Sequence, residues 1–351
     1  MPRIKKNAIV AVTAEDSVYV GLDVHKASIH VAVWKNGMLA AAWVTTADYA
    51  TLADQLEPLR PALRQVAYEA GPTGFVLARL LASRQLPVMV CAPSKTPQTA
   101  GDETKCDRLD ARKIAEYAAK ELLSAVTVPT EREEHERALV RHRSHVVRNI
   151  SRVKARIKST LLFHQCGELA SWTQAERLRL LNSELPLELR FELEALFQEL
   201  SFFEAQKKQA EEKLQAALAH RDHAATVKRL ESHPGVGKVL SACFVLELFR
   251  PGRFKDGDSV ARYVGLAPRV RQSGATCRGG PLLKSGQGKL RAVLIEAAWR
   301  WRACDERARA IYGRLVANTG NGKKAIVGLA RRLAIRLWTM WTRGEAYDPA
   351  S

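Results

Sequence analysis

The pattern of short apolar runs between residues 18 and 91 places the strongest limit on how this chain can fold. Residues 18–24 (VYVGLDV), 28–34 (SIHVAVW) and 38–44 (MLAAAWV) are each typical of a strand. The Asn36-Gly37 pair between the second and third runs favours a tight hairpin turn. Further along, we expect helices over about 49–59 and 75–83, and strands over 65–69 and 87–91. Three antiparallel strands followed by alternating helices and strands predict an α/β domain.

Four acidic residues fall at special places in this pattern. The element order is that of the ribonuclease-H-like fold, in which the first and fourth strands are neighbours, so Asp23 and Glu69 would meet at one end of the sheet. Asp107 and Asp110 begin an amphipathic helix, and their spacing of three places both carboxylates on one side of a turn. Taken singly, each acid could be a surface residue, and Asp near a helix start also complements the helix dipole.

Four converging carboxylates repel one another unless cations neutralise them. An oxygen-rich acidic set suits Mg²⁺, with Mn²⁺ as the alternative ion. The arrangement therefore predicts a phosphoryl-transfer site with two metal ions, held by Asp23, Glu69, Asp107 and Asp110.

The charge of the chain points to its class of partner. Its 351 residues carry a formal net charge of +18, which is typical of a nucleic-acid-binding protein, although a merely basic protein is the alternative. The six cysteines form no CxxC pair, which favours reduced thiols over a zinc site. No run reaches about 18 apolar residues, so we expect a soluble, cytoplasmic protein without a membrane partner.

The region 129–225 is predicted to be a helical spacer. Leu139, Val146, Ile150, Val153 and Ile157 follow coiled-coil spacing, and a second apolar seam over 189–203 predicts a helix packed against the first. The remaining faces of the first helix carry basic residues without acids, as expected for contacts to phosphates. The candidate nucleic-acid contacts on this helix are Arg141, Arg148, Arg152, Lys154, Arg156 and Lys158. A plain helical hairpin is the alternative and is compatible with that role.

Two stretches of the region 226–351 are candidates for contact with DNA. Residues 233–238 (HPGVGK) resemble the turn of a helix-hairpin-helix element, in which Gly235, Gly237 and Lys238 would approach a phosphate; a packing turn is the alternative. Residues 261–289 are dense in Gly, Ser and Arg, and there Ser273 is flanked by Arg269, Arg271 and Arg278. A serine needs activation to act as a nucleophile, and arginines can stabilise phosphoryl charge, but without context this serine is only a turn residue.

Five of these stretches together resemble one protein family. Residues 21–26 (GLDVHK), 68–69 (YE) and 104–111 (TKCDRLDA) are similar to the acidic motifs of the DEDD insertion-sequence transposases of the IS110 family. These are bridge-RNA-guided serine recombinases whose first domain resembles the junction nuclease RuvC. Residues 265–274 (GLAPRVRQSG) and 284–299 (KSGQGKLRAVLIEAAW) resemble the serine motif and the helix after it.

The resemblance implies a fold, a reaction and a set of partners. It implies a RuvC-like catalytic domain over 1–128, the basic coiled-coil spacer over 129–225, and a mainly helical transposase domain over 226–351. Ser273 takes the position of the nucleophile that forms a phosphoserine–DNA link, with Ser285 as the alternative, while the four acids bind the metals. Implied partners are donor and target DNA, a structured guide RNA, and copies of the chain assembling as dimers into a tetramer near the nucleoid.

Two other functions compete with this interpretation. In a RuvC-like junction endonuclease, a metal-bound water would attack the phosphate and Ser273 would be structural. A non-enzymatic nucleic-acid scaffold would leave the four acids without a role.

Overall fold

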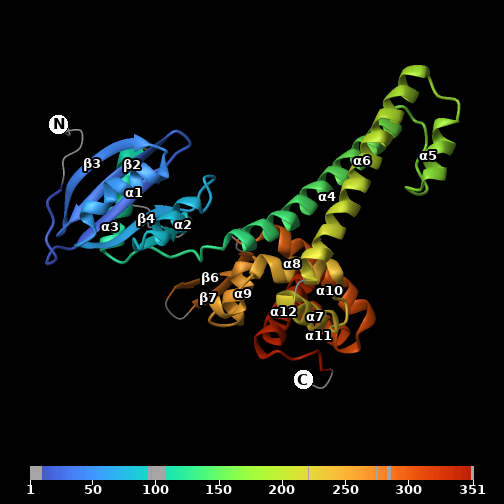
Figure 1. Cartoon of the computed structure of the whole chain (residues 1–351). Helices are drawn as coiled ribbons and strands as arrows, with labels where there is room; N and C mark the ends of the chain where they lie inside the picture. The colour runs from blue at the N-terminus through green and yellow to red at the C-terminus, as the bar shows by residue number, and fades with distance from the viewer. Residues whose placement is uncertain are drawn as a thin grey trace. The chain divides into compact units, whose positions relative to one another are not determined.

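The computed structural model describes residues 10–93, 96, 107–219, 221–273, 276–282 and 286–348; for residues 107–109, 221–222, 270–273, 276–279 and 281 it describes the backbone alone. The chain divides into two compact units (Figure 1), Met1–Pro129, called here the sheet unit, and Thr130–Ser351, called the helical unit. Among the described helices, none is long and apolar enough to cross a membrane.

The sheet unit is built on five strands in the order β3-β2-β1-β4-β5. The strands β1–β3 pair antiparallel, whereas β4 lies parallel to both β1 and β5. The elements of this unit are β1 (Val18–Val24), β2 (Ser28–Lys35), β3 (Met38–Thr46), α1 (Tyr49–Leu56), η1 (Glu57–Leu59), β4 (Leu63–Glu69), α2 (Val76–Ser83), β5 (Val88–Cys91) and α3 (Asp107–Ala119). The mixed α/β character and the β1–β4 neighbourhood agree with the sequence-based expectation.

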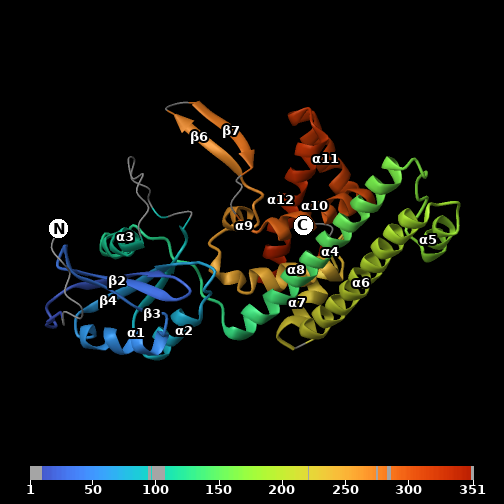
Figure 2. The same cartoon turned by 90° about the horizontal axis from the view of Figure 1, so that it is seen from above.

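Helices cover both faces of this sheet, and side-chain size differs between the faces. Toward α1 and α2 the strands turn large residues such as Val20, Leu22 and Tyr68, which are fully buried. Toward α3 the closest strand residues are small, including Ala32 and Ala67, while Trp34 and Tyr19 pack beside them. Figure 2 shows α3 on one side of the sheet and α1 and α2 on the other. Because successive strand residues face opposite sides, this alternation follows directly from the sequence.

The helical unit contains nine α-helices among the described residues, two of them very long. Its elements are α4 (Glu131–Phe163), α5 (Gln174–Leu181), α6 (Leu187–Leu218), α7 (Arg221–Glu231), α8 (Lys238–Leu248), η3 (Pro251–Arg253), α9 (Gly257–Tyr263), β6 (Pro268–Ser273), β7 (Thr276–Leu282), α10 (Gly288–Cys304), α11 (Glu306–Thr319) and α12 (Gly322–Arg343). The 33 residues of α4 begin at a capping box formed by Thr130 and Glu133. Helices α4 and α6 lie side by side and are joined at their far end through α5 (Figure 1).

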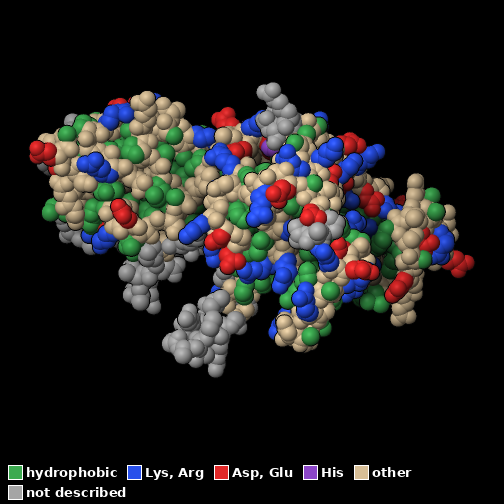
Figure 3. Space-filling model, turned by 90° about the horizontal axis from the view of Figure 1, so that it is seen from below, with side chains coloured by type: hydrophobic (Ala, Val, Ile, Leu, Met, Phe, Trp, Pro, Cys, Tyr) green, Lys and Arg blue, Asp and Glu red, His purple; other side chains and the backbone are tan. Residues whose placement is uncertain are grey.

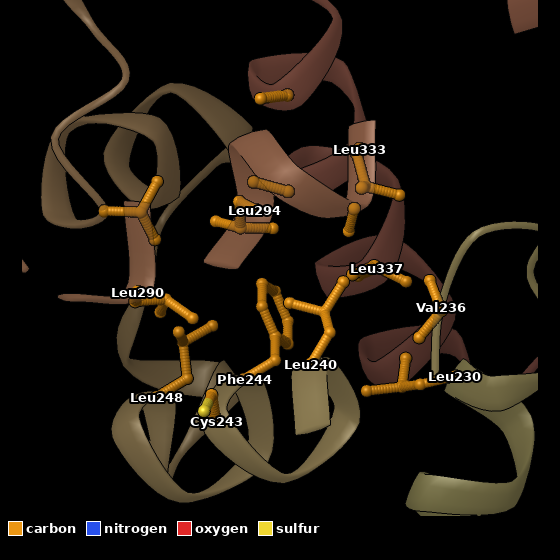
Figure 4. Packing of buried hydrophobic residues seen from close by; sticks show 14 of the residues in the cluster. Leu230, Val236, Leu240, Cys243, Phe244, Leu248, Leu290, Leu294, Leu333 and Leu337 are labelled. Atoms are coloured by element: carbon orange, nitrogen blue, oxygen red, sulfur yellow. The ribbon is translucent and has the colours of Figure 1, made fainter. Parts of the chain in front are cut away.

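The core of the helical unit is assembled around α8, of which all nine residues from Leu240 to Leu248 are buried. Figure 4 shows Leu240, Phe244 and Leu248 of α8 facing Leu294 of α10 and Leu337 of α12. A helix that is apolar on every side needs partners all around, and these are supplied by α4, α7 and α10 among others.

The segment around Ser273 differs from the loop expected for it. It forms a two-stranded antiparallel hairpin, β6–β7, which extends away from the helices of its unit (Figure 2). The hairpin is fixed at its base, where a Cβ on Gly286 would lie 2.7 Å from the backbone oxygen of Tyr263 and 2.8 Å from the nitrogen of Gly265. Gly286 has φ +103°, so both its conformation and its close approach require glycine.

Candidate functional site

The helix α3 lies in backbone contact with the central strand β1. A Cβ atom on Gly21 would be only 2.4 Å from the amide nitrogen of Ala115, so no larger residue fits there. Ala115 itself is fully buried, and Ala111 is 1 % exposed. Because Gly21 precedes Asp23 by two residues and Ala111 follows Asp110, this contact sets the first turn of α3 against the end of β1.

Asp23 and Glu69 lie at the carboxyl ends of neighbouring parallel strands. The register pairs Leu22 of β1 with Tyr68 of β4, so the two acids follow at adjacent positions. The Oδ2 atom of Asp23 is 2.9 Å from His25 Nε2, and the Thr96 hydroxyl donates to Oε1 of Glu69 at 2.9 Å. The strand topology thus brings both acids to one end of the sheet.

His25 and Thr96 were not among the residues expected from the sequence to contact the acids. His25 follows Asp23 by two residues, and this spacing at a strand end was the signal that could have identified it. Thr96 lies 27 residues beyond Glu69, outside any motif, and gave no such signal. The thiol of Cys91 is a further neighbour: burial, and then the charge of Glu69, raise its pKa to about 12, so it stays protonated and inert.

Asp107 and Asp110 occupy the first turn of α3, as the sequence predicted. Asp110 is partly buried, while the side chain of Asp107 lies outside the described residues. Within the described side chains, no three acids, histidines or cysteines are close enough to hold a metal ion. The donors at this end of the sheet are carboxylate oxygens, which fit a hard divalent cation better than a soft one.

The basic residues of α4 fall into two groups. Toward α6, Arg143 pairs with Glu211 at 2.7 Å and Arg156 pairs with Glu199 at 3.1 Å. Lys154 lies 3.9 Å from a carboxylate oxygen of Glu204 and over the Trp172 ring. The part of α4 beyond Glu136 has no acid of its own, and acids of α6 lie beside these basic residues instead.

The other group has no acid of α6 beside it among the described residues. Arg148, Arg152 and Lys158 are exposed, and the described part of the chain gives them no ion pair. Arg141 is 45 % exposed although its Nε lies 3.4 Å from Glu247. On the face of the helical unit that is visible in Figure 3, Lys and Arg side chains are spread over the surface.

The buried carboxylate of Glu247 joins α8 to α4. It is 1 % exposed and lies 3.2 Å from the Nε atom of Arg137, which is itself buried. Two cations, Arg137 and Arg141, thus compensate one buried acid.

The candidate nucleophile Ser273 is the last residue of β6 and lies opposite Thr276 of β7. The register also pairs Arg271 with Arg278, which places two basic residues side by side near the end of the hairpin. Arg269 precedes them on β6 and is exposed. The side chains of Ser273, Arg271 and Arg278, like the whole of Ser285, lie outside what the structure describes.

The HPGVGK turn links α7 to α8, and its two glycines have different surroundings. Gly235 has φ +81°, and a Cβ there would lie 2.6 Å from the backbone nitrogen of Trp301, so packing explains it. A Cβ on Gly237 would meet nothing within 4 Å. Gly237 caps α8 and is exposed together with Lys238, so a ligand could reach the backbone there.

Comparison with known families links the two units to one kind of protein. A DEDD-type IS110 model, described as a transposase, matches residues 20–165, which include all four candidate metal ligands. A second model, described as "Transposase IS116/IS110/IS902 family", matches residues 227–313, which include Ser273.

Relatives along most of the chain have the same kind of name. A Sinorhizobium fredii protein named as a transposase (y4qE) is 29 % identical over 83 % of this chain and 74 % of its own length. A protein of Pseudomonas aeruginosa named as a family 20 transposase is 28 % identical, covering 86 % and 90 %. The transposase for insertion sequence element IS1533 of Leptospira borgpetersenii is 25 % identical, covering 91 % and 94 %. The chain belongs to the DEDD-type transposases of the IS110 family and is an enzyme that acts on DNA.

Proposed function

We propose that Asp23, Glu69, Asp107 and Asp110 form the metal-binding part of the transposase site. A DEDD domain implies dependence on a divalent metal in general, and we propose Mg²⁺, two ions per site, with Mn²⁺ able to replace it. The observation that supports this set is the backbone contact between Gly21 and α3, which holds the first turn of α3 at the end of β1. The bound cations would supply Lewis-acid stabilisation of charge on a phosphate oxygen.

The proposed nucleophile is Ser273. Its Oγ would form a bond to phosphorus while the bond from phosphorus to a deoxyribose oxygen breaks. The serine proton passes to a base, and the departing oxygen takes up a proton. Attack by the hydroxyl of another strand reverses these steps and releases the serine, so the phosphodiester energy is retained and no ATP is needed. Arg269, Arg271 and Arg278 on the same hairpin would stabilise the phosphoryl charge.

We also propose the remaining features implied by the family. A structured guide RNA would direct the enzyme to donor and target DNA, and the chain would assemble as dimers into a tetramer in the cytoplasm, at the nucleoid. The α4–α6 pair would be the coiled-coil spacer, and the turn at Gly235, Gly237 and Lys238 would serve as a helix-hairpin-helix contact. In this scheme the helical unit comprises the spacer, to residue 225, and the transposase domain beyond it.

A denaturing gel of labelled DNA tests the serine assignment. The wild type is expected to form a protease-sensitive protein–DNA band that Ser273→Ala lacks, with cleavage reduced by several orders of magnitude, as in nucleophile deletions of hydrolases (about 10⁶ in one case). Ser285→Ala is the matched control and should retain the band. Cleavage by Ser273→Ala with release of free ends would instead identify water as the nucleophile. Loss of the band in Ser285→Ala alone would move the role to Ser285.

A further inference from the structure

A contact between two basic side chains joins α4 to the start of α10. The Nζ atom of Lys289 lies 2.9 Å from Nε2 of His145. An ammonium group can only donate hydrogen bonds, so Nε2 must accept, and the imidazole of His145 is neutral in this arrangement. The lysine therefore keeps its charge while the histidine gives up its own, and the pair carries one positive charge.

The surroundings of this pair are also positive. On α4, Arg141, His145 and Arg148 follow each other at spacings of four and three, so they share one exposed face. Partial burial is the largest cause that lowers the pKa of Lys289, and the positive charges of Arg141 and Arg148 lower it further. The charge of Lys289 is the largest cause that lowers the pKa of His145. Desolvation lowers it next, followed by the charges of Arg148 and His142.

The nearby acid does not neutralise this group. Glu247 of α8 favours the charged form of Lys289, but its buried carboxylate already lies against Arg137 and Arg141. The cluster formed by Arg141, His145, Arg148 and Lys289, called here the α4–α10 cluster, therefore keeps an excess of positive charge on accessible side chains.

The position of the cluster relates it to the serine hairpin. Lys289 lies in the first turn of α10, three residues after Gly286, which is held against the backbone of Tyr263 and Gly265. Arg291 follows Lys289 by two residues on α10, and its Nη1 atom donates a hydrogen bond to the backbone oxygen of Gly265 at 3.3 Å. An anion in the cluster would thus lie near the base of the β6–β7 hairpin.

We propose that the α4–α10 cluster binds a phosphodiester of nucleic acid and that His145 takes up a proton when the phosphate binds. The phosphate would replace Nε2 as the acceptor of the Lys289 ammonium, and the protonated imidazole would donate a hydrogen bond of its own. No covalent bond changes, and the proton comes from solvent. The inference rests on the proposed function in that the anion is the backbone of the DNA or RNA on which the enzyme acts.

Salt dependence of binding tests the phosphate contact. The full-length chain is titrated onto two labelled probes, a 30-base-pair DNA duplex and an RNA hairpin, by fluorescence anisotropy at several salt concentrations. Lys289→Gln and Arg148→Gln should each lower the slope of log K against log salt by roughly 0.7–0.9, and Lys289→Arg should restore it. Arg179→Gln is the matched control, because Arg179 lies on α5 and is paired with Glu176 at 2.7 Å. A slope lost with one probe only identifies DNA or RNA as the source of the phosphate.

Proton uptake tests the role of His145. Calorimetric titrations with the same probes at pH 6.5, in buffers of different ionisation enthalpy, should show up to one more proton bound by the wild type than by His145→Gln. His135→Gln, which alters an exposed histidine nearer the start of the same helix, should behave as the wild type. The affinity of the wild type should also rise more steeply than that of His145→Gln between pH 7.5 and 5.5.

Two results would overturn the inference. Unchanged slopes in both Lys289→Gln and Arg148→Gln would show that the cluster does not contact phosphate. Equal proton uptake by His145→Gln and the wild type would exclude the protonation step. The gel assay of Ser273→Ala reports separately on the covalent mechanism, because a failure there alters neither the salt slopes nor the proton count.

Discussion

A Cβ atom on Gly21 would lie 2.1 Å from the backbone oxygen of Ala111, closer than any real Cβ contact. This close contact between β1 and α3 holds the first turn of α3 beside the sheet, and that turn contains two of the four candidate metal ligands, Asp107 and Asp110.

We expect Gly21→Ala to lower both stability and cleavage. The added methyl group meets backbone atoms of α3, which cannot rotate away, so the helix must move at a cost of about 1–3 kcal/mol or more. Urea unfolding and strand cleavage measure the two effects. Gly313→Ala is the control: a Cβ there meets nothing within 4 Å, and in helix α11 alanine should stabilise by up to about 1 kcal/mol. An active, fully stable Gly21→Ala would contradict the close contact.

Asp107→Asn and Asp110→Asn should each abolish strand cleavage while leaving nucleic-acid affinity nearly unchanged. The amide removes the charge that attracts the cation, whereas the basic residues that bind nucleic acid lie on other elements. Cleavage and anisotropy assays in Mg²⁺ separate these effects. Glu116→Gln alters an acid on the same helix that is paired with Lys120 and should cleave normally. Near-normal recombination by either aspartate variant would exclude the metal assignment.

Glu247→Gln should destabilise the helical unit by about 3–5 kcal/mol, because it leaves the buried guanidinium of Arg137 without its carboxylate. Denaturant unfolding measures this loss. In a double-mutant cycle, Arg137→Gln combined with Glu247→Gln should cost less than the sum of the single changes. Additive costs would show that the two groups do not interact.

The buried His233 should make the fold sensitive to mild acid. Burial between the rings of Trp301 and Tyr347 lowers the pKa of His233 from 6.5 to about 4. The unfolded chain therefore binds the proton first, so stability is complete above pH 6.5 and falls by on the order of 3 kcal/mol as the pH drops toward 4. His233→Gln should flatten the dependence of unfolding free energy on pH across this window, and the exposed His142→Gln should not. An equal slope in His233→Gln and the wild type would contradict this assignment.

The sheet unit was largely predictable because its strands alternate or run apolar over short lengths between clear turn residues. Strand β1 has the predicted bounds, and β2 to β5 differ from the prediction by at most two residues at either end. The parallel pairing of β1 with β4 followed from the element order, and with it the meeting of Asp23 and Glu69.

The helical unit was less predictable, for two physical reasons. The β6–β7 hairpin is rich in Arg, Gly and Ser and lacks an alternating apolar face, so the residues around Ser273 looked like a loop. The partners of basic residues on α4 come from distant sequence, as with Arg156 and Glu199, 43 residues apart. Such pairing between helices depends on how they pack, which the pattern of either helix alone does not contain.

Among the residues that the structure describes, the hairpin that carries Ser273 has two strands, and each presents one edge to which no described strand is paired. Sheets of this size are marginally stable in water by themselves. We therefore expect the geometry around Ser273 to be completed by the strand of nucleic acid laid against it, which would make reactivity conditional on correct assembly. If Ser273 is the nucleophile, as proposed, its hydroxyl would then become reactive only after the nucleic acid has bound.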